Sequence, residues 1–182
     1  MSYYDVDAIL TDAQKVPCTF EIDVPGLGYL DGNPGGTVKA GTKLDLPLWL
    51  GVMLAVSSGN NSGSQPLVTL DFPAPLQQRV INALKADPNS VDLRAQAPHF
   101  YALGARILDL FEDDEMVDVL TDTFRTRAAK IADHAHNARG PLTDGVDFLR
   151  GLDESERVVF KSAHEGPKSV KNWSQDVKKT NT

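Results

Sequence analysis

The stretch LDLPLWLGVMLAV, residues 44–56, is an almost unbroken apolar run in a chain of 182 residues with a formal net charge of -7. A helix that crosses a bilayer needs roughly 20 mostly apolar residues, and this run ends at Ser57. The run therefore predicts a buried helix of a soluble protein, beginning at Pro47. Because the run is apolar all round, the helix must be covered on more than one side.

The N-terminal sequence has none of the features of an export signal. MSYYDVDAILTDAQK contains three aspartates and lacks both a basic region and a continuous apolar region. The single cysteine, Cys18, can form no internal disulfide and supplies no metal-site spacing. We therefore expect an intracellular protein that has no membrane contact.

The composition limits the class of protein. A chain of 182 residues suits one large domain or two small ones, and a hydrophobic content of 41% is enough for a packed core. The 25 acidic residues exceed the 18 Lys and Arg residues, which argues against phosphate-backbone binding as the main activity. A local basic patch stays open as an alternative.

The local sequence pattern changes near residues 71–75. Before this point, glycine, proline and short runs with β character dominate; Phe20, Ile22 and Val24 alternate with polar residues, as in a strand buried on one face. Strands are predicted at residues 18–24, 28–30, 42–46 and 67–72. The segment SSGNNSGSQP, residues 57–66, is predicted to be a mobile loop.

After Pro73 the apolar residues recur at helical spacings of three and four. The predicted apolar faces include Leu76, Val80, Ile81 and Leu84 on the first helix and Met116, Leu120, Phe124, Ala128, Ile131 and Ala135 on the third. Gly104 is expected to let another helix approach closely, and Arg125, Arg127 and Lys130 are expected to complement the dipole of their helix. Helices are predicted at residues 75–86, 97–110, from the acidic cluster 112–115 to Gly140, 144–163 and, as a short element, 169–177.

These patterns predict an α+β fold, mostly α. A small N-terminal β-rich domain, residues 1–72 with one apolar helix at about 47–56, is followed by a C-terminal helical bundle domain, residues 73–182.

The polar residues predict no catalytic, cofactor or metal site. His134 and His136 lie two apart on a predicted helix, so they point in different directions, and solvent-facing side chains are the simpler interpretation. The acids of EDDE, residues 112–115, fan outward and suit the helix dipole better than a divalent cation. The glycines of residues 26–36 match no phosphate-binding loop and are expected to form turns.

Two functional alternatives remain open. His99 with Asp92 could act as a general base in a small hydrolase, although no nucleophile motif accompanies them and a structural role for His99 is simpler. The tail KSVKNWSQDVKK could bind single-stranded DNA through Trp173 and its lysines, although a solvated terminus is simpler. The lysines concerned are Lys168, Lys171, Lys178 and Lys179.

Three strings carry a resemblance to a known family. LDLPLWL (44–50), ADPNSVDLRAQAPHFYALGARIL (86–108) and FLRGLDESERVVFKSAHEG (148–166) together resemble the Psf-three family of subunits of the eukaryotic GINS complex. The opening YYDVDAILTDAQKVPCTFEIDVPGLGYLD also fits, so the resemblance covers nearly the whole chain in the correct order.

The resemblance implies a non-catalytic scaffold subunit without a cofactor, located in the nucleus. It implies a heterotetramer with the Sld-five, Psf-one and Psf-two subunits, in which a small B domain precedes a helical A domain. It further implies that the complex joins Cdc45 and the MCM ring to form the active replicative DNA helicase in initiation and elongation. ATP hydrolysis would belong to MCM, and any contact of this chain with DNA would be limited to the assembly.

Interfaces of this kind concentrate their binding energy in aromatic and large aliphatic side chains. Each such residue could instead belong to the core of its own domain. The candidate subunit-interface or interdomain residues are Leu46, Trp49, Leu50, Phe100, Tyr101, Phe124, Phe148 and Phe160.

Overall fold

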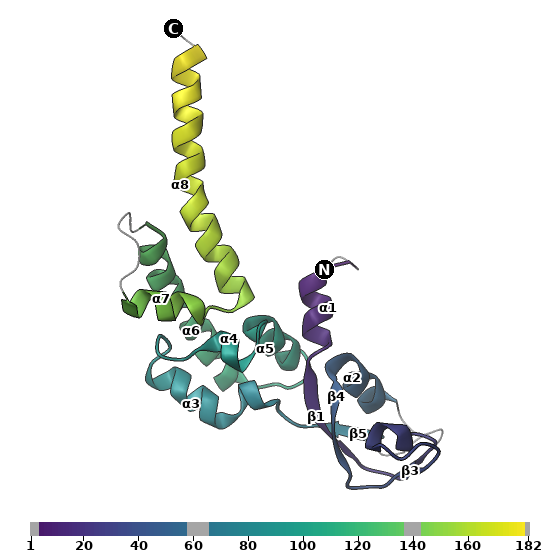
Figure 1. Cartoon of the computed structure of the whole chain (residues 1–182). Helices are drawn as coiled ribbons and strands as arrows, with labels where there is room; N and C mark the ends of the chain where they lie inside the picture. Colours follow the sequence, from purple (N-terminus) through teal and green to yellow (C-terminus); the bar gives the residue numbers. More distant parts are fainter. Residues whose placement is uncertain (1–3, 58–65, 137–142, 181–182) are drawn as a thin grey trace. The chain divides into compact units, whose positions relative to one another are not determined.

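The computed structural model describes residues 4–57, 66–136 and 143–180 (Figure 1). The chain divides into two compact units, Met1–Gln77 and Gln78–Thr182. The first unit contains the strands and two short α-helices, and the second is built of helices. The predicted α+β class, mostly α, is confirmed. Most of the segment predicted as a loop, residues 57–66, lies outside the described residues.

A three-stranded antiparallel sheet forms the centre of the first unit. Strand β1 (Lys15–Phe20) lies between β4 (Lys43–Pro47) and β5 (Val68–Leu70). The register pairs Cys18 with Leu44 on one side and with Leu70 on the other. Successive side chains of a strand point to opposite faces, so Val16, Cys18 and Phe20 share the buried face. Two further strands, β2 (Val24–Pro25) and β3 (Thr37–Val38), pair with each other.

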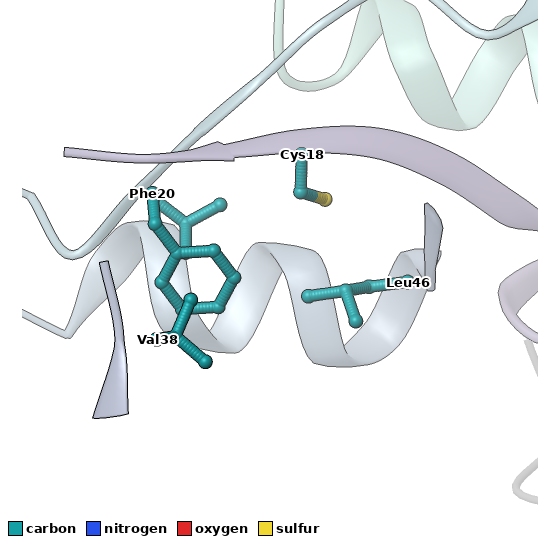
Figure 2. Close-up of a cluster of buried hydrophobic side chains, with 5 residues drawn as sticks. Cys18, Phe20, Val38 and Leu46 are labelled. Carbon is teal, nitrogen blue, oxygen red and sulfur yellow. The ribbon is translucent and has the colours of Figure 1, made fainter. Parts of the chain in front are cut away.

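The apolar run of residues 44–56 ends strand β4 and then forms helix α2 (Leu48–Val56), which begins one residue after the expected start. Helix α2 packs on β1, β4 and β5. A β-carbon on Gly51 would lie 2.8 Å from Leu70 Cδ2, so glycine permits the close approach of helix and sheet. Figure 2 shows the side chains of Cys18, Phe20, Val38 and Leu46 directed toward one another in the core of this unit. The sheet therefore covers one side of α2.

Two strand predictions for the first unit differ from the structure, and one helix was not predicted. Strand β1 spans 15–20 rather than 18–24, because its pairing with β4 begins at Lys15 opposite Pro47 and its pairing with β5 ends at Phe20 opposite Val68. Residues 28–30 belong to a 3-10 turn, η1 (Gly28–Asp31), since Gly28 bonds the backbone of Gly36 and Asn33. Helix α1 (Val6–Asp12) was not predicted; the Asp5 carboxylate caps it.

The second unit consists of six helices in the described part of the chain. A 3-10 turn, η2 (Ala74–Leu76), precedes it, and the extended backbone of Gln77 delays the helix predicted from residue 75. Gly104 on α5 faces Leu120 on α6, where a β-carbon would lie 2.7 Å from Leu120 Cδ1, so the predicted close approach is confirmed. The helices are α3 (Gln78–Ala86), α4 (Leu93–Gln96), α5 (Phe100–Leu108), α6 (Asp114–His136), α7 (Thr143–Arg150) and α8 (Glu154–Thr180).

The prediction of a single helix at residues 144–163 is wrong. Helix α7 ends at Arg150, and a new helix, α8, begins at Glu154. Asp153 Oδ1 accepts the Glu156 N–H at 2.8 Å, and Glu156 Oε2 accepts the Asp153 N–H at 3.3 Å. This reciprocal pair is a capping box, which begins a helix. Helix α8 then continues past Pro167 to Thr180, so residues 169–177 form no separate helix (Figure 1). Among the described residues, no helix combines the length and apolar character needed to cross a membrane.

The Cys18 thiol gives a chemical probe of the first unit. Burial, with smaller contributions from Asp45 and Asp71, raises the pKa of this thiol to about 11. We expect a thiol reagent at pH 8 to label the native chain slowly and the urea-unfolded chain rapidly, because the thiolate is the nucleophile. Since the raised pKa favours the protonated folded state, the contribution of Cys18 to stability should fall as the pH rises from about 8.5 toward 11. Equal labelling rates in both states would contradict the buried placement.

Candidate interaction surfaces

A buried ion pair lies at the centre of the helical unit. Arg127 of α6 is 1% exposed, and its guanidinium holds the Glu156 carboxylate of α8 with two bonds, Nε to Oε1 at 2.6 Å and Nη2 to Oε2 at 2.9 Å. Arg127 Nη1 also donates to Pro88 O at 2.8 Å and to Val91 O at 3.0 Å. One side chain thus connects α6, α8 and the segment between α3 and α4. Because a guanidinium group is planar and donates hydrogen bonds in fixed directions, it strongly orients the groups that it contacts.

Tyr101 connects helix α5 to the same carboxylates. Its hydroxyl donates to Glu156 Oε1 at 3.1 Å, and its backbone N–H donates to Asp153 Oδ2 at 3.3 Å. Burial and the negative charge of Glu156 raise the pKa of the Tyr101 phenol, so it stays a hydrogen-bond donor. Burial also raises the pKa of Asp153, an effect that the N–H groups of Glu156 and Tyr101 oppose. The network fixes where α5 and α6 lie beside α8.

The role predicted for Arg127 is therefore wrong, because its side chain is buried rather than directed outward as part of a helix-dipole pattern. The buried stripe of α6 passes through Thr123 and Arg127, not through Phe124 and Ala128. Phe124 is consequently turned outward. The pair Asp153 and Glu156, three residues apart, is a capping-box signal that could have located the start of α8 from the sequence.

An open apolar groove runs between α5 and α6. It has a volume of about 300 Å³. Within it, Val117 is 44% exposed and Phe124 is 38% exposed. The rings of Tyr101 and Phe124 meet edge to face with their centroids 5.2 Å apart. We call this surface the α5/α6 groove; its main lining residues are Tyr101, Ala105, Leu108, Val117, Leu120 and Phe124.

The first unit exposes large apolar side chains on both of its α-helices. On α1, Thr11 is buried, whereas Val6, Ile9 and Leu10 are about half exposed or more. On α2, Trp49 and Met53, four residues apart, are 50% and 54% exposed. A helix that turns its apolar residues outward differs from the usual surface helix of a monomer. These five side chains are therefore candidates for contact with another protein.

The eight candidate interface residues fall into three groups. Leu46, Phe100 and Phe148 are buried in the chain, so they present no surface to a partner. Leu50, Tyr101 and Phe160 are half-buried, and Trp49 and Phe124 are exposed. Of the eight, Tyr101 meets both Phe124 and Phe100 ring to ring, and Phe124 shares the groove with it. Periodicity could not separate these groups, because a helix stripe has two edges and only packing shows which edge is covered.

Of the two residues considered for a hydrolase, Asp92 caps a helix and His99 is buried. Asp92 accepts the Ala95 N–H at 2.9 Å and caps α4, while His99 is buried at the start of α5. In the described residues, no hydrogen bond joins His99 to Asp92. The carboxylate of Asp113 caps α6 through the Met116 N–H at 3.0 Å, and Glu115 pairs with Lys85.

The residues considered for metal binding and for the alternative of DNA binding gain no support within the described part of the chain. Within the described ranges, no group of three or more His, Cys, Asp or Glu residues could hold a metal ion. His134 is half-buried against the Phe148 ring rather than facing solvent, whereas His136 is exposed. Trp173 on α8 is 68% exposed. The side chains of Lys168, Lys171, Lys178 and Lys179 lie outside those that the structure describes.

The two units correspond to two family models. Residues 4–56 match the model described as the PSF3 N-terminal domain, and residues 75–175 match that of the GINS complex protein helical bundle domain. The second match covers more than half of the chain and contains the buried network and the α5/α6 groove. The chain belongs to the PSF3 family of GINS complex proteins.

Whole-chain comparisons agree with the membership in the PSF3 family. The chain is 63% identical to the DNA replication complex GINS protein psf3 of Aspergillus fumigatus, over 98% of this chain and 99% of the relative. It is 64% identical to the protein of the same name from Phaeosphaeria nodorum, over 98% of each. Identity to the Schizosaccharomyces pombe protein is 40%, over 97% of this chain and 99% of the relative. The resemblance to GINS subunits is thus confirmed.

Proposed function

We propose that this PSF3-family chain is a non-catalytic scaffold subunit of a GINS complex that acts in DNA replication, in the nucleus. The observation that carries the proposal is the α5/α6 groove, an open apolar surface in the segment that matches the GINS helical bundle domain. The names of the relatives, which are DNA replication complex GINS proteins, support the process.

The groove is suited to receive a helix of another subunit. Phe124 and Val117 expose much of their apolar surface while Tyr101 is held from behind by Glu156. A preorganised aromatic pair loses little conformational entropy on binding, which favours a stable interface. The proposed neighbours are the Sld-five, Psf-one and Psf-two subunits, in a heterotetramer.

The outward apolar residues of α1 and α2 would serve a second contact. Interfaces between permanent partners commonly bury more than about 2,000 Å², which a single groove does not supply. We propose that this second surface contributes within the GINS complex or bridges it to Cdc45 and the MCM ring. The complex would then stabilise the active helicase by binding that arrangement preferentially.

Co-expression tests the scaffold proposal directly. The chain is expressed alone and then with the three proposed partners, and the mass of each species is measured by light scattering after size exclusion. We expect poor yield or aggregation alone and one equimolar four-chain particle with the partners. A soluble monomer that does not associate with the three partners would contradict the proposal and return attention to the hydrolase and DNA-binding alternatives.

A further inference from the structure

A second concave surface of the helical unit shares no lining residue with the α5/α6 groove. It has a volume of about 790 Å³ and is formed by α7, by the first half of α8 and by Arg94 of α4. We call it the α7/α8 pocket. Two backbone bonds set α4 beside it, from Arg94 N–H to Gly151 O at 3.2 Å and from Glu154 N–H to Pro98 O at 3.0 Å.

The floor of the α7/α8 pocket is apolar. Leu149 and Phe160 pack against the buried cluster of Ile131, Phe148 and Leu152, and they also line the pocket. The Phe160 ring stacks on the His164 ring, with a centroid distance of 5.9 Å. The His164 Nδ1 atom lies 3.1 Å from Ala135 O, which holds that imidazole in place. The floor is therefore fixed by the core of the unit.

Cations surround this floor. Four cationic side chains line the pocket against two carboxylates, those of Glu154 and Glu165, on a chain whose net charge is -7. Local charge at the pocket thus has the opposite sign to that of the chain. Such a reversal steers anionic groups to the site. The cations are Arg94, Arg150, Arg157 and Lys161.

Two of these cations are available to a ligand. Arg157 and Lys161 lie four apart on α8, so they share one face. Neither side chain forms an ion pair or hydrogen bond with any described residue; the one bond of Arg157 outside the helix ladder is from its backbone N–H to Asp153 O. Arg94 is only 3.6 Å from Glu154, and Arg150 is 4.0 Å from Asp147, both in exposed pairs. Exposed pairs of this kind are weak and exchange readily for a better anion.

We propose that the α7/α8 pocket binds an acidic polypeptide segment that has a large apolar side chain between Asp or Glu residues. The apolar side chain would lie on Leu149 and Phe160, and the carboxylates would pair with Arg157 and Lys161. A volume of this size is typical of pockets that enclose a ligand, about 300–1,000 Å³. A continuous phosphate backbone fits less well, because it carries no large apolar group to cover the floor formed by Leu149 and Phe160. This inference goes beyond the proposed role in the GINS complex.

The test is fluorescence anisotropy on the full chain, alone or in its assembled complex. The probe is a short fluorescein-labelled peptide in which Phe-Leu is flanked on both sides by Asp and Glu. The comparison peptide carries Asn and Gln instead, and a labelled oligothymidylate is the third probe. We expect the acidic peptide to bind at least about tenfold more tightly than the amide peptide. Its affinity should fall as salt is added. No binding of the acidic peptide, or tighter binding of the oligothymidylate, would overturn the proposal.

Charge-reversal variants locate the binding. The double variant Arg157→Glu with Lys161→Glu should lower the affinity for the acidic peptide at least about tenfold, because two attractive charges become repulsive ones. The control, Arg79→Glu with Arg125→Glu, changes the net charge equally on exposed positions of α3 and α6 and should leave affinity within about twofold. If the Glu double variant loses the circular dichroism signal of its helices, Arg157→Gln with Lys161→Gln takes its place in the measurement. Equal losses of affinity in the pocket variant and in the control would show that only the overall charge matters. This result would overturn the proposal that the peptide binds in the α7/α8 pocket.

Discussion

Replacing Glu156 by alanine should destabilise the helical unit by about 3–5 kcal/mol, because it leaves the Arg127 guanidinium buried without its carboxylate. The change also removes the acceptor of the Tyr101 hydroxyl and half of the capping box that begins α8. Glu156 of α8 thus contacts both α5 and α6 through polar bonds. We would measure urea unfolding of the full chain by circular dichroism at the helical band.

Glu154→Ala is the matched control for this measurement. Both residues are glutamates in the first turn of α8, but the Glu154 side chain is 40% exposed, and among the described residues its only ion pair is a long one, to Arg94. The control substitution should lower the free energy of unfolding by less than about 1 kcal/mol. If Glu156→Ala also stayed within that limit, the network would not hold the unit together.

A second comparison separates the ion pair from simple packing. The double change Arg127→Met with Glu156→Leu removes both charges together, and it should recover much of the stability that either single change loses. Should Glu156→Ala fail to fold, Glu156→Gln retains the shape and the hydrogen-bonding oxygen and still removes the charge. A double variant no more stable than Glu156→Ala would contradict the buried-charge explanation.

Phe124→Asp should prevent assembly of the four-chain particle while leaving the helical unit folded. Phe124 is 38% exposed in the α5/α6 groove, so aspartate there is tolerated in the free chain but places an unpaired charge in the proposed interface. Loss of a central aromatic and burial of a charge together should weaken association by at least about 100-fold. The measurement is the mass distribution after co-expression with the partner subunits.

Ala129→Asp is the control for the groove. It adds the same charge at an exposed position of α6 that does not line the groove. We expect the control to assemble like the wild type. A Phe124→Asp chain that still gave the full four-chain particle would show that the groove is not an interface, and the outward apolar residues of α1 and α2 would then be the surface to change.

Local signals located most helices of the second unit, but they determined the buried face of some helices and not of others. The stripe of α3 was predicted correctly because Val80, Ile81 and Leu84 are all apolar and nothing polar competes for the buried side. The predicted apolar face of α6 contains Phe124 and Ala128, whereas the buried face contains the preceding residues, Thr123 and Arg127. The prediction left Arg127 out because a charged side chain, taken alone, is expected to be exposed. An arginine can be buried only when a carboxylate meets it, and that carboxylate lies on another helix, in Glu156.

The sequence by itself determined the fold class and the family, because periodicity, turn residues and the quoted strings are local features that survive without knowledge of the contacts. It also predicted a helix in the second part of the apolar run at 44–56, which the structure has as α2 (Leu48–Val56). Only the tertiary structure decided which candidates face outward: Phe100 and Phe148 are core, while Phe124 and Trp49 are exposed. The physical reason is that burial depends on what packs against a residue from elsewhere in the chain, and the register of that packing is not encoded in local spacing.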